Sequence, residues 1–208
     1  MENTDEKIKV LYINSCVRGN LLSRTQKIAD AFLDELERSN PNVEITEKNL
    51  MLMNPLFLNY FNFKQHEELI SQEKYNHSVF DLAREFAAAD RIVIAAPLWE
   101  LSYPAILRVY LENVSVAGIA FKYGSEGAIG LCRAEKLMYI TTRGDDFSRP
   151  PLSQLEMGAR HIEALCGMYG IKSFDCIAAD GLDLLGVNPD KIVAAAIETA
   201  KAKARSFI

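Results

Sequence analysis

The sequence lacks the features that direct a chain into a membrane or onto a nucleic acid. Its N-terminal stretch MENTDEKIKV contains no apolar segment, and no apolar run approaches the roughly 20 residues that a membrane-spanning helix requires. Lysine and arginine form no run and the net charge is −5, whereas nucleic-acid-binding domains carry a basic patch or stripe. We therefore expect a cytoplasmic protein with no membrane association and no nucleic-acid partner.

Cysteine and histidine are too few and too scattered to form a recognisable metal site. The four cysteines include no C-x-x-C pair, and the three histidines are not spaced as paired ligands on a helix. We expect reduced, buried thiols, histidines on solvated faces, and no metal ion. The residues concerned are Cys16, Cys132, Cys166, Cys176, His66, His77 and His161.

Three common nucleotide-binding and hydrolytic motifs are also absent. There is no G-x-G-x-x-G: Gly124, Gly127 and Gly130 are spaced G-x-x-G-x-x-G within a loop rather than between a strand and a helix. No Walker A sequence and no G-x-S-x-G elbow occurs. These absences argue against a dinucleotide-binding Rossmann protein, a P-loop NTPase and an α/β-hydrolase.

Strand-like and helix-like segments alternate along the chain. Short segments rich in β-branched residues predict strands over 8–13, 43–45, 92–96, 136–142 and 174–178. The alternation indicates one α/β domain over residues 1–208, with a five-stranded parallel sheet and helices on both faces. For a chain of this length we predict the flavodoxin-like strand order 2-1-3-4-5.

Capping residues and apolar spacing predict the helices. Ser23 and Gln26 have capping-box spacing at the start of one helix, and Asn188 precedes Pro189 at the start of the last. We predict a polar helix over 67–88 after an irregular stretch at 50–66, and an amphipathic helix over 152–169 with Leu155 on its inner face. The helix led by Pro104 is apolar almost all round, which suits burial by a partner as well as by the sheet.

In this strand order a ligand is expected where the order reverses, at the carboxyl ends of the strands. Three loops meet there, 14–22, 97–103 and 143–151. The first offers the hydroxyls of Ser15, Ser23 and Thr25, and the bases Arg18 and Arg24. Because a helix N-terminus presents unpaired N–H groups, this loop could bind a phosphate. The alternative is that Ser23 only caps the helix and the arginines are solvated.

The other two loops could accommodate a planar ring. Leu98 and Trp99 could form an apolar wall, and Arg143 and the backbone of Gly144 could donate to an electron-rich ring edge. Alternatively, Trp99 packs in the core and Arg143 makes a surface ion pair. Taken together with the first loop, the three segments indicate a pocket for flavin mononucleotide (FMN).

At these loops the chain resembles the FMN-dependent NADH-azoreductase family, flavodoxin-fold NAD(P)H:quinone oxidoreductases. The resemblance spans nearly the whole chain, and its most specific part is the Ala-Gly-x-x-Phe-Lys-Tyr segment that ends at Tyr123. The matching segments are Ser15 with 23–25 and 28–32, 96–101, 116–123 and 141–145.

The resemblance implies specific roles for residues in these segments. The FMN phosphate and ribityl chain would be held by Ser15, Ser23, Arg24 and Thr25. The isoalloxazine ring would be framed by Leu98, Trp99, Glu100 and Leu101 from one loop, and by Thr142, Arg143, Gly144 and Asp145 from another. Phe121 and Tyr123, in an insertion at 117–135 over the site, would lie near the substrate.

The resemblance also implies the activity. NADH or NADPH, with NADH favoured because no 2′-phosphate clamp is visible, would reduce FMN, and a quinone or azo compound would then be reduced at the same flavin face. Arg143 would stabilise the reduced flavin, and the Pro104 helix would form the interface of a homodimer. A flavodoxin-like electron carrier and a flavin-free binding or hydrolytic protein of the same fold are the alternatives.

The chain departs from the family pattern at three positions. Glu100 stands where asparagine is usual, Leu21 where serine is common, and Asp145 where a second glycine is common. The Glu100 carboxylate would lower the flavin potential if it faced the ring, and would have no such effect if it pointed to water.

Overall fold

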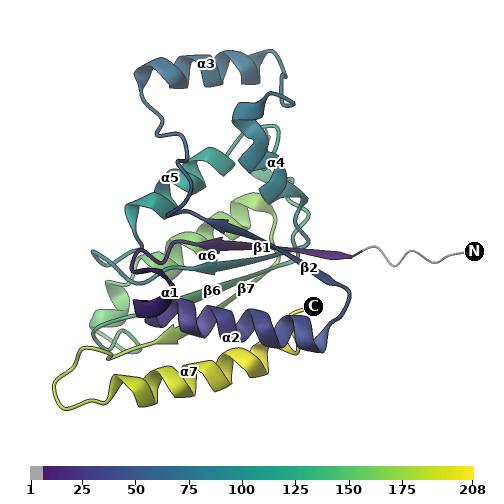
Figure 1. Ribbon diagram of the computed structural model, residues 1–208. Coiled ribbons are helices and arrows are strands. Elements are labelled where there is room, and N and C mark those ends of the chain that lie inside the picture. The colour runs from purple at the N-terminus through teal and green to yellow at the C-terminus, as the bar shows by residue number, and fades with distance from the viewer. Residues whose placement is uncertain (1–6) are drawn as a thin grey trace, which may run out of the picture.

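The computed structural model describes residues 7–208, without the side chain of Asn20. Five parallel strands form the main sheet in the order β2-β1-β3-β6-β7, which confirms the predicted order. The carboxyl ends of the strands therefore meet at one edge of the sheet (Figure 1). The strands are β1 (Ile8–Asn14), β2 (Val43–Asn49), β3 (Arg91–Ala95), β6 (Lys136–Thr142) and β7 (Ser173–Ala179).

Helices cover both faces of the sheet (Figure 1), as predicted. Successive side chains of a strand point to opposite faces, so that in β3 Ile92 and Ile94 join one core and Val93 and Ala95 the other. The first core is closed by α4 (Asp81–Ala88), α5 (Ala105–Val114) and α6 (Gly158–Tyr169), and the second by α2 (Arg24–Ser39) and α7 (Pro189–Ala204).

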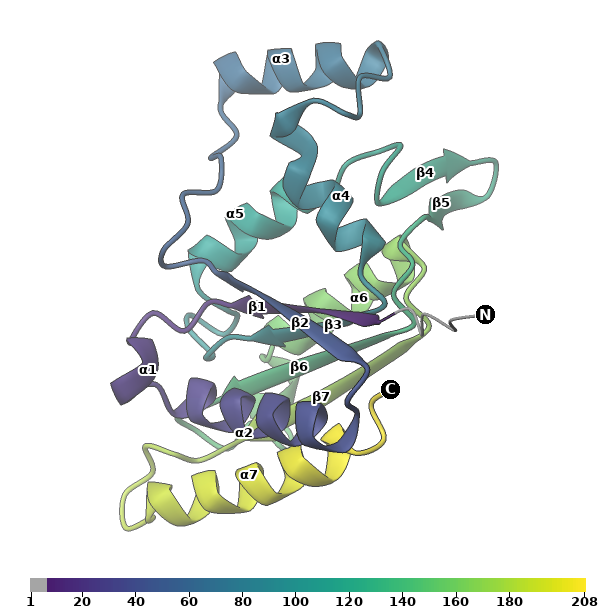
Figure 2. The same ribbon diagram turned by 45° about the vertical axis from the view of Figure 1, so that its right-hand side comes forward.

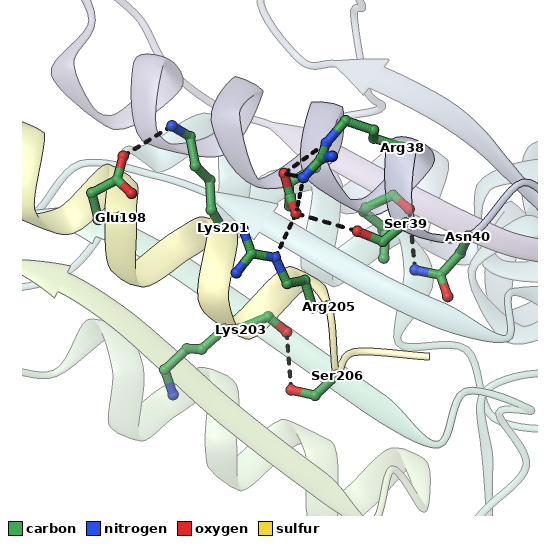
Figure 3. Close-up of polar contacts among 10 residues, drawn as sticks. Arg38, Ser39, Asn40, Glu198, Lys201, Lys203, Arg205 and Ser206 are labelled. Carbon is green, nitrogen blue, oxygen red and sulfur yellow. Dashed lines mark hydrogen bonds and ion pairs between the residues drawn. The ribbon is translucent and has the colours of Figure 1, made fainter.

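An ion-pair network joins the two helices of the second face. Figure 3 shows Arg38 of α2 and Arg205, which follows α7, converging between the helices. Arg205 Nε donates to Glu35 Oε1 at 2.6 Å, and Arg38 Nε donates to Glu35 Oε2 at 3.0 Å. These two hydrogen bonds hold the pKa of the Glu35 carboxyl at about 2. The network fixes the end of α7 against α2.

The polar helix predicted over 67–88 is wrong, because two separate helices occupy this region. α3 (Tyr60–Ser71) begins inside the stretch predicted to be irregular, and a 3-10 turn, η1 (Ser78–Phe80), leads into α4. The side chains of Asn59 and Asn62 make a capping box at the start of α3, and Glu73 adopts a positive φ of 54° just after its end. A capping box usually has Ser or Thr at the N-cap and Glu or Gln three residues later. Here asparagine occupies both positions, so the usual sequence pattern did not reveal the helix start.

Two further helix predictions need correction. The helix predicted over 152–169 begins only at Gly158, after a 3-10 turn η2 (Leu152–Gln154), and Leu155 is exposed. Pro104 is the N-cap of α5 rather than its first helical residue. Leu107, Tyr110 and Leu111 are buried in the core of their own chain, whereas Ile106 and Val109 are half-buried. The role of α5 in a homodimer stays a prediction.

The insertion over 117–135 does not cover the carboxyl edge of the sheet. It forms a hairpin of β4 (Phe121–Gly124) and β5 (Gly127–Gly130), in which Gly130 packs on the backbone of Gly170 at the end of α6. Since α6 runs antiparallel to the strands, its end lies at the amino edge, and Figure 2 shows the hairpin there, opposite α1 (Gly19–Leu22). Among the described residues, no helix is long and apolar enough to cross a membrane.

Candidate functional site

A narrow cavity of about 70 Å³ opens at the carboxyl edge of the sheet, where the strand order reverses. Loops after β1, β3, β6 and β7 contribute to its lining. The lining residues are Val17, Arg18, Ser23, Arg24, Thr25, Pro97, Leu98, Trp99, Thr142, Arg143, Gly144, Leu182 and Asp183.

The first turn of α2 forms one end of the cavity. Ser23 Oγ accepts the N–H of Gln26 at 3.1 Å, so Ser23 caps the helix as the spacing predicted. Thr25 Oγ1 and Thr142 Oγ1 share a hydrogen bond of 2.6 Å, which anchors the helix start to the end of β6. The first turn of a helix leaves N–H groups without helical partners, and such a turn binds anions well.

Arg24 and Asp183 close the cavity on the side of β7. Arg24 Nη2 lies 2.9 Å from Asp183 Oδ1, and Nη1 donates to the carbonyl of Leu182 at 3.2 Å. A Cβ on Gly144 would lie only 2.7 Å from Asp183 Oδ2, so glycine leaves the room that this contact requires. Leu182 and Asp183 were not among the predicted site residues, because the loop after the last strand carries no motif; the glycine in this loop, Gly181, was the available signal.

The loop after β3 makes a tight turn that holds Trp99 at the cavity. Trp99 and Ser102 exchange backbone hydrogen bonds of 2.9 and 2.8 Å, and the two residues between them, Glu100 and Leu101, have φ of 49° and 63°. Trp99 is 44% exposed, so the alternative that it packs in the core is wrong. With Leu98 it forms an apolar wall of the cavity.

A second cavity of about 850 Å³ lies on the other side of this turn, between the starts of α5 and α6. Trp99 lines both cavities, whereas Glu100 lines only the second. There Tyr103 Oη is hydrogen-bonded to His161 Nδ1, and Arg108 Nη1 lies 3.1 Å from His161 Nε2. Burial, together with the charge of Arg108, lowers the pKa of His161.

Arg143 is neither on the surface nor free. Its guanidinium is buried, with Nη2 3.6 Å from Glu156 Oε1 and Nη1 3.4 Å from Asp180 Oδ1. The remaining nitrogen, Nε, is buried with no hydrogen-bond partner. The expected surface ion pair is thus wrong in its location, and one N–H of a residue that lines the cavity remains available.

Several predicted site residues are not among those that line the first cavity. Ser15 is fully buried beneath it and donates to the carbonyl of Ala95 at 3.0 Å. Leu101 belongs to the turn, and Asp145 is exposed while its carbonyl accepts the N–H of Gly181 at 3.0 Å. Phe121 and Tyr123 lie on the hairpin at the opposite edge of the sheet.

The remaining titratable residues do not form a catalytic centre of their own. All four cysteines are free thiols, of which Cys16 and Cys166 are buried. His77 is exposed as expected, but His66 is buried in edge-to-face contact with Phe80. No group of His, Cys, Asp and Glu in the described part of the chain is arranged to hold a metal ion.

The fold and the site define a class of protein that the comparisons confirm. Residues 8–204 match the family described as flavodoxin-like fold. Over 199 residues the chain is 41% identical to the FMN-dependent NADH:quinone oxidoreductase 2 of Clostridium acetobutylicum, covering 96% of this chain and 99% of the relative. It is 40% identical to the FMN-dependent NADH:quinone oxidoreductase of Clostridium perfringens, with the same coverage. The chain belongs to this family, as the resemblance indicated.

Solved structures show the same fold at lower sequence identity. An azoreductase from Bacillus anthracis superposes with a TM-score of 0.86 at 24% identity, covering 96% of this chain and 99% of that one. An FMN-dependent NADH-azoreductase from the same species, in complex with FMN, gives a TM-score of 0.85 at 20% identity, covering 95% of this chain and 98% of that one.

Proposed function

We propose that the protein is an FMN-dependent NADH:quinone oxidoreductase that also reduces azo compounds. The observation that carries this proposal is the first cavity, which combines a helix N-terminus, an apolar wall and an unpaired buried N–H at the point where the strand order reverses. The names of the relatives support the same reading.

The residues that line the cavity offer groups suited to each of the three parts of FMN. The first turn of α2, with Ser23, Arg24 and Thr25, would hold the phosphate, and the buried Ser15 would support this loop from below. Leu98 and Trp99 would pack along the flat ring, whose polar edge suits the unpaired Nε–H of Arg143. Leu101 and Asp145 would contribute their backbone only.

Bound FMN would supply two-electron chemistry between NADH and the acceptor. The residues of the site would bind and orient the reactants, and no nucleophilic side chain is required. Donor and acceptor would occupy the same open face in turn, which gives ping-pong kinetics. A cytoplasmic location is part of this proposal, since free thiols suit a reducing compartment.

A homodimer is also part of the proposal. Tyr123 is 79% exposed and lies on the hairpin at the amino edge of the sheet, away from the cavity of its own chain. A place near the substrate would therefore require the hairpin of a second copy. Exposed aromatic residues around the start of α3, including Phe57, Tyr60 and Phe61, offer an apolar surface for such an association.

The test is the absorption spectrum of the purified protein, reconstituted with FMN if it is colourless. We expect a flavin spectrum at about one FMN per chain, anaerobic bleaching by NADH, and recovery on addition of a quinone. A protein that takes up no FMN would support the flavin-free alternative. A bound flavin that NADH does not bleach would support the electron carrier.

A further inference from the structure

Three charged residues, two of them buried and one half-buried, lie together beside the first cavity. Arg143 follows β6, Asp180 follows β7, and Glu156 precedes α6. Their side chains are 8%, 17% and 5% exposed, and each carboxylate lies within 3.6 Å of the guanidinium. We call these three residues the charge triad. Its one positive and two negative formal charges give a net charge of −1, which is opposite in sign to the charge of Arg143 alone.

The backbone holds each member of the triad in place. Both carboxylate oxygens of Glu156 accept the N–H of Ala159, at 3.0 and 3.2 Å, in the first turn of α6. A Cβ on Gly158 would lie 2.9 Å from Glu156 Oε1, so glycine makes room for the carboxylate. Asp180 Oδ1 accepts the N–H of Phe147 at 3.3 Å. The two carboxylates are therefore fixed on either side of Arg143.

Arg143 Nε is the donor that this arrangement leaves without a partner. Buried N–H groups almost always have an acceptor, and an exception calls for one from a ligand or a water. The nitrogens that pair with Glu156 and Asp180 are both at the far end of the side chain, so Nε is the nitrogen left without an acceptor, in a residue that lines the cavity.

We propose that Glu156 and Asp180 are positioning residues that orient Arg143 toward bound FMN and, through their charge, weaken the binding of reduced relative to oxidised flavin. A fixed negative charge in a water-poor site acts strongly on charge that develops nearby, and reduction adds negative charge to the flavin. The midpoint potential of the enzyme is therefore held low. This inference rests on the proposed function, and it adds a consequence: a low potential favours electron transfer to weak acceptors such as azo compounds.

The test uses Glu156→Gln, reconstituted with FMN. Glutamine keeps an oxygen that can accept from Ala159 and removes one negative charge. We expect reduced FMN to gain affinity relative to oxidised FMN by about ten-fold, which is an upward shift of about 30 mV for a two-electron couple. Asp180→Asn should shift the potential in the same direction. Glu198→Gln makes the same chemical change on α7, where Glu198 pairs with Lys201, and should leave the potential unchanged.

The outcomes separate this inference from the proposed function. If wild-type protein binds no FMN, the proposed function fails. If FMN binds and both variants keep the wild-type potential, or lower it, the inference is overturned while the proposed function stands. Should Glu156→Gln not fold, Asp180→Asn decides alone, since its carboxylate is the more exposed of the two.

Discussion

Arg143 compensates two buried carboxylates, and its removal is expected to destabilise the fold. Arg143→Met should lower the free energy of unfolding by about 3–5 kcal/mol, because the buried carboxylate of Glu156 and the half-buried one of Asp180 would remain uncompensated. Urea denaturation of the apoprotein measures this. Arg149, on the same loop, pairs with Asp146 at 3.1 Å but is largely exposed. Arg149→Met should therefore lose less than about 1 kcal/mol; equal losses in the two variants would contradict the argument.

Glu35 makes the free energy of unfolding depend on pH, and the direction of its pKa shift gives the direction of that dependence. Its folded pKa of about 2 lies below the usual value of about 4.3 for a glutamate, because Arg38 and Arg205 donate to its carboxylate. The carboxylate therefore stabilises the fold fully above about pH 4.3, and this contribution is lost as the pH falls through that value toward 2. Glu35→Gln should be destabilised most at pH 7, and its difference from wild type should shrink below pH 4.

Urea denaturation at pH 7 and at pH 3 measures the two differences. Glu198→Gln, which removes an exposed carboxylate paired with Lys201, serves as the control and should show little difference at either pH. A difference between Glu35→Gln and wild type that stays constant with pH would show that the loss comes from packing rather than from charge.

At the level of single residues, sequence reasoning located the loops better than it located the side chains. Ser23, Thr25 and Trp99 were predicted at the site, and the structure brings them to one cavity, because loop position follows from the strand order. The surroundings of Arg143 could not be predicted, since Glu156 and Asp180 reach it from segments that carry no motif. The inward direction of the Ser15 side chain could not be predicted either. Whether its hydroxyl binds a ligand or a backbone carbonyl depends on local backbone geometry.

At the scale of elements, the strands were predictable because buried parallel strands are short apolar runs. The helix starts at Ser23 and Asn188 were predictable because both residues cap through their side chains. The start of α3 was missed because the helix buries little: Leu69 and Ile70 pack in part against a small core cluster, and of its residues only His66 is buried. Helical periodicity in a sequence reports burial, and an element that packs little leaves little signal.

The turn after Trp99 explains why asparagine, the usual residue of the family, would suit position 100 better than the glutamate of this chain. Glu100 and Leu101 both have positive φ, and turns of this kind favour asparagine or glycine, since a left-handed backbone costs other residues about 1–2 kcal/mol. Glu100→Asn should therefore stabilise the protein by about 0.5–1 kcal/mol and raise Tm by about 1–4 °C. The flavin midpoint potential should stay within about 10 mV of wild type, because the Glu100 side chain lines the second cavity rather than the first.

Calorimetry and a spectroscopic redox titration measure the two effects separately. Glu126→Asn is the matched control, because Glu126 lies in the turn between β4 and β5 without a positive φ and should gain no stability. A rise of about 20–45 mV in Glu100→Asn would show instead that the carboxylate acts on the flavin.

For the whole molecule, the strand order was sufficient to predict where the site lies. The position of the hairpin was not predictable, because connectivity does not say toward which edge of the sheet an insertion folds. Gly130 determines that choice through its contact with the backbone of Gly170, a contact between residues far apart in the sequence. As a result Tyr123, predicted near the substrate, lies exposed on the hairpin and away from the cavity of its own chain.

The association of two copies is the prediction that concerns the whole molecule. Phe61 is 83% exposed on α3, which stands away from the sheet (Figure 1), and in a two-fold dimer each such surface would be used by both subunits. We expect wild-type protein to sediment as a dimer at micromolar concentration. Phe61→Asp should raise the dissociation constant by about 10- to 100-fold, because loss of an interface aromatic costs about 1–3 kcal/mol. Gln65→Asp, an exposed change on the same helix with the same added charge, should leave it nearly unchanged. A wild-type protein that sediments as a monomer with full NADH:quinone activity would refute the dimer and, with it, any role of Tyr123 at a neighbouring site.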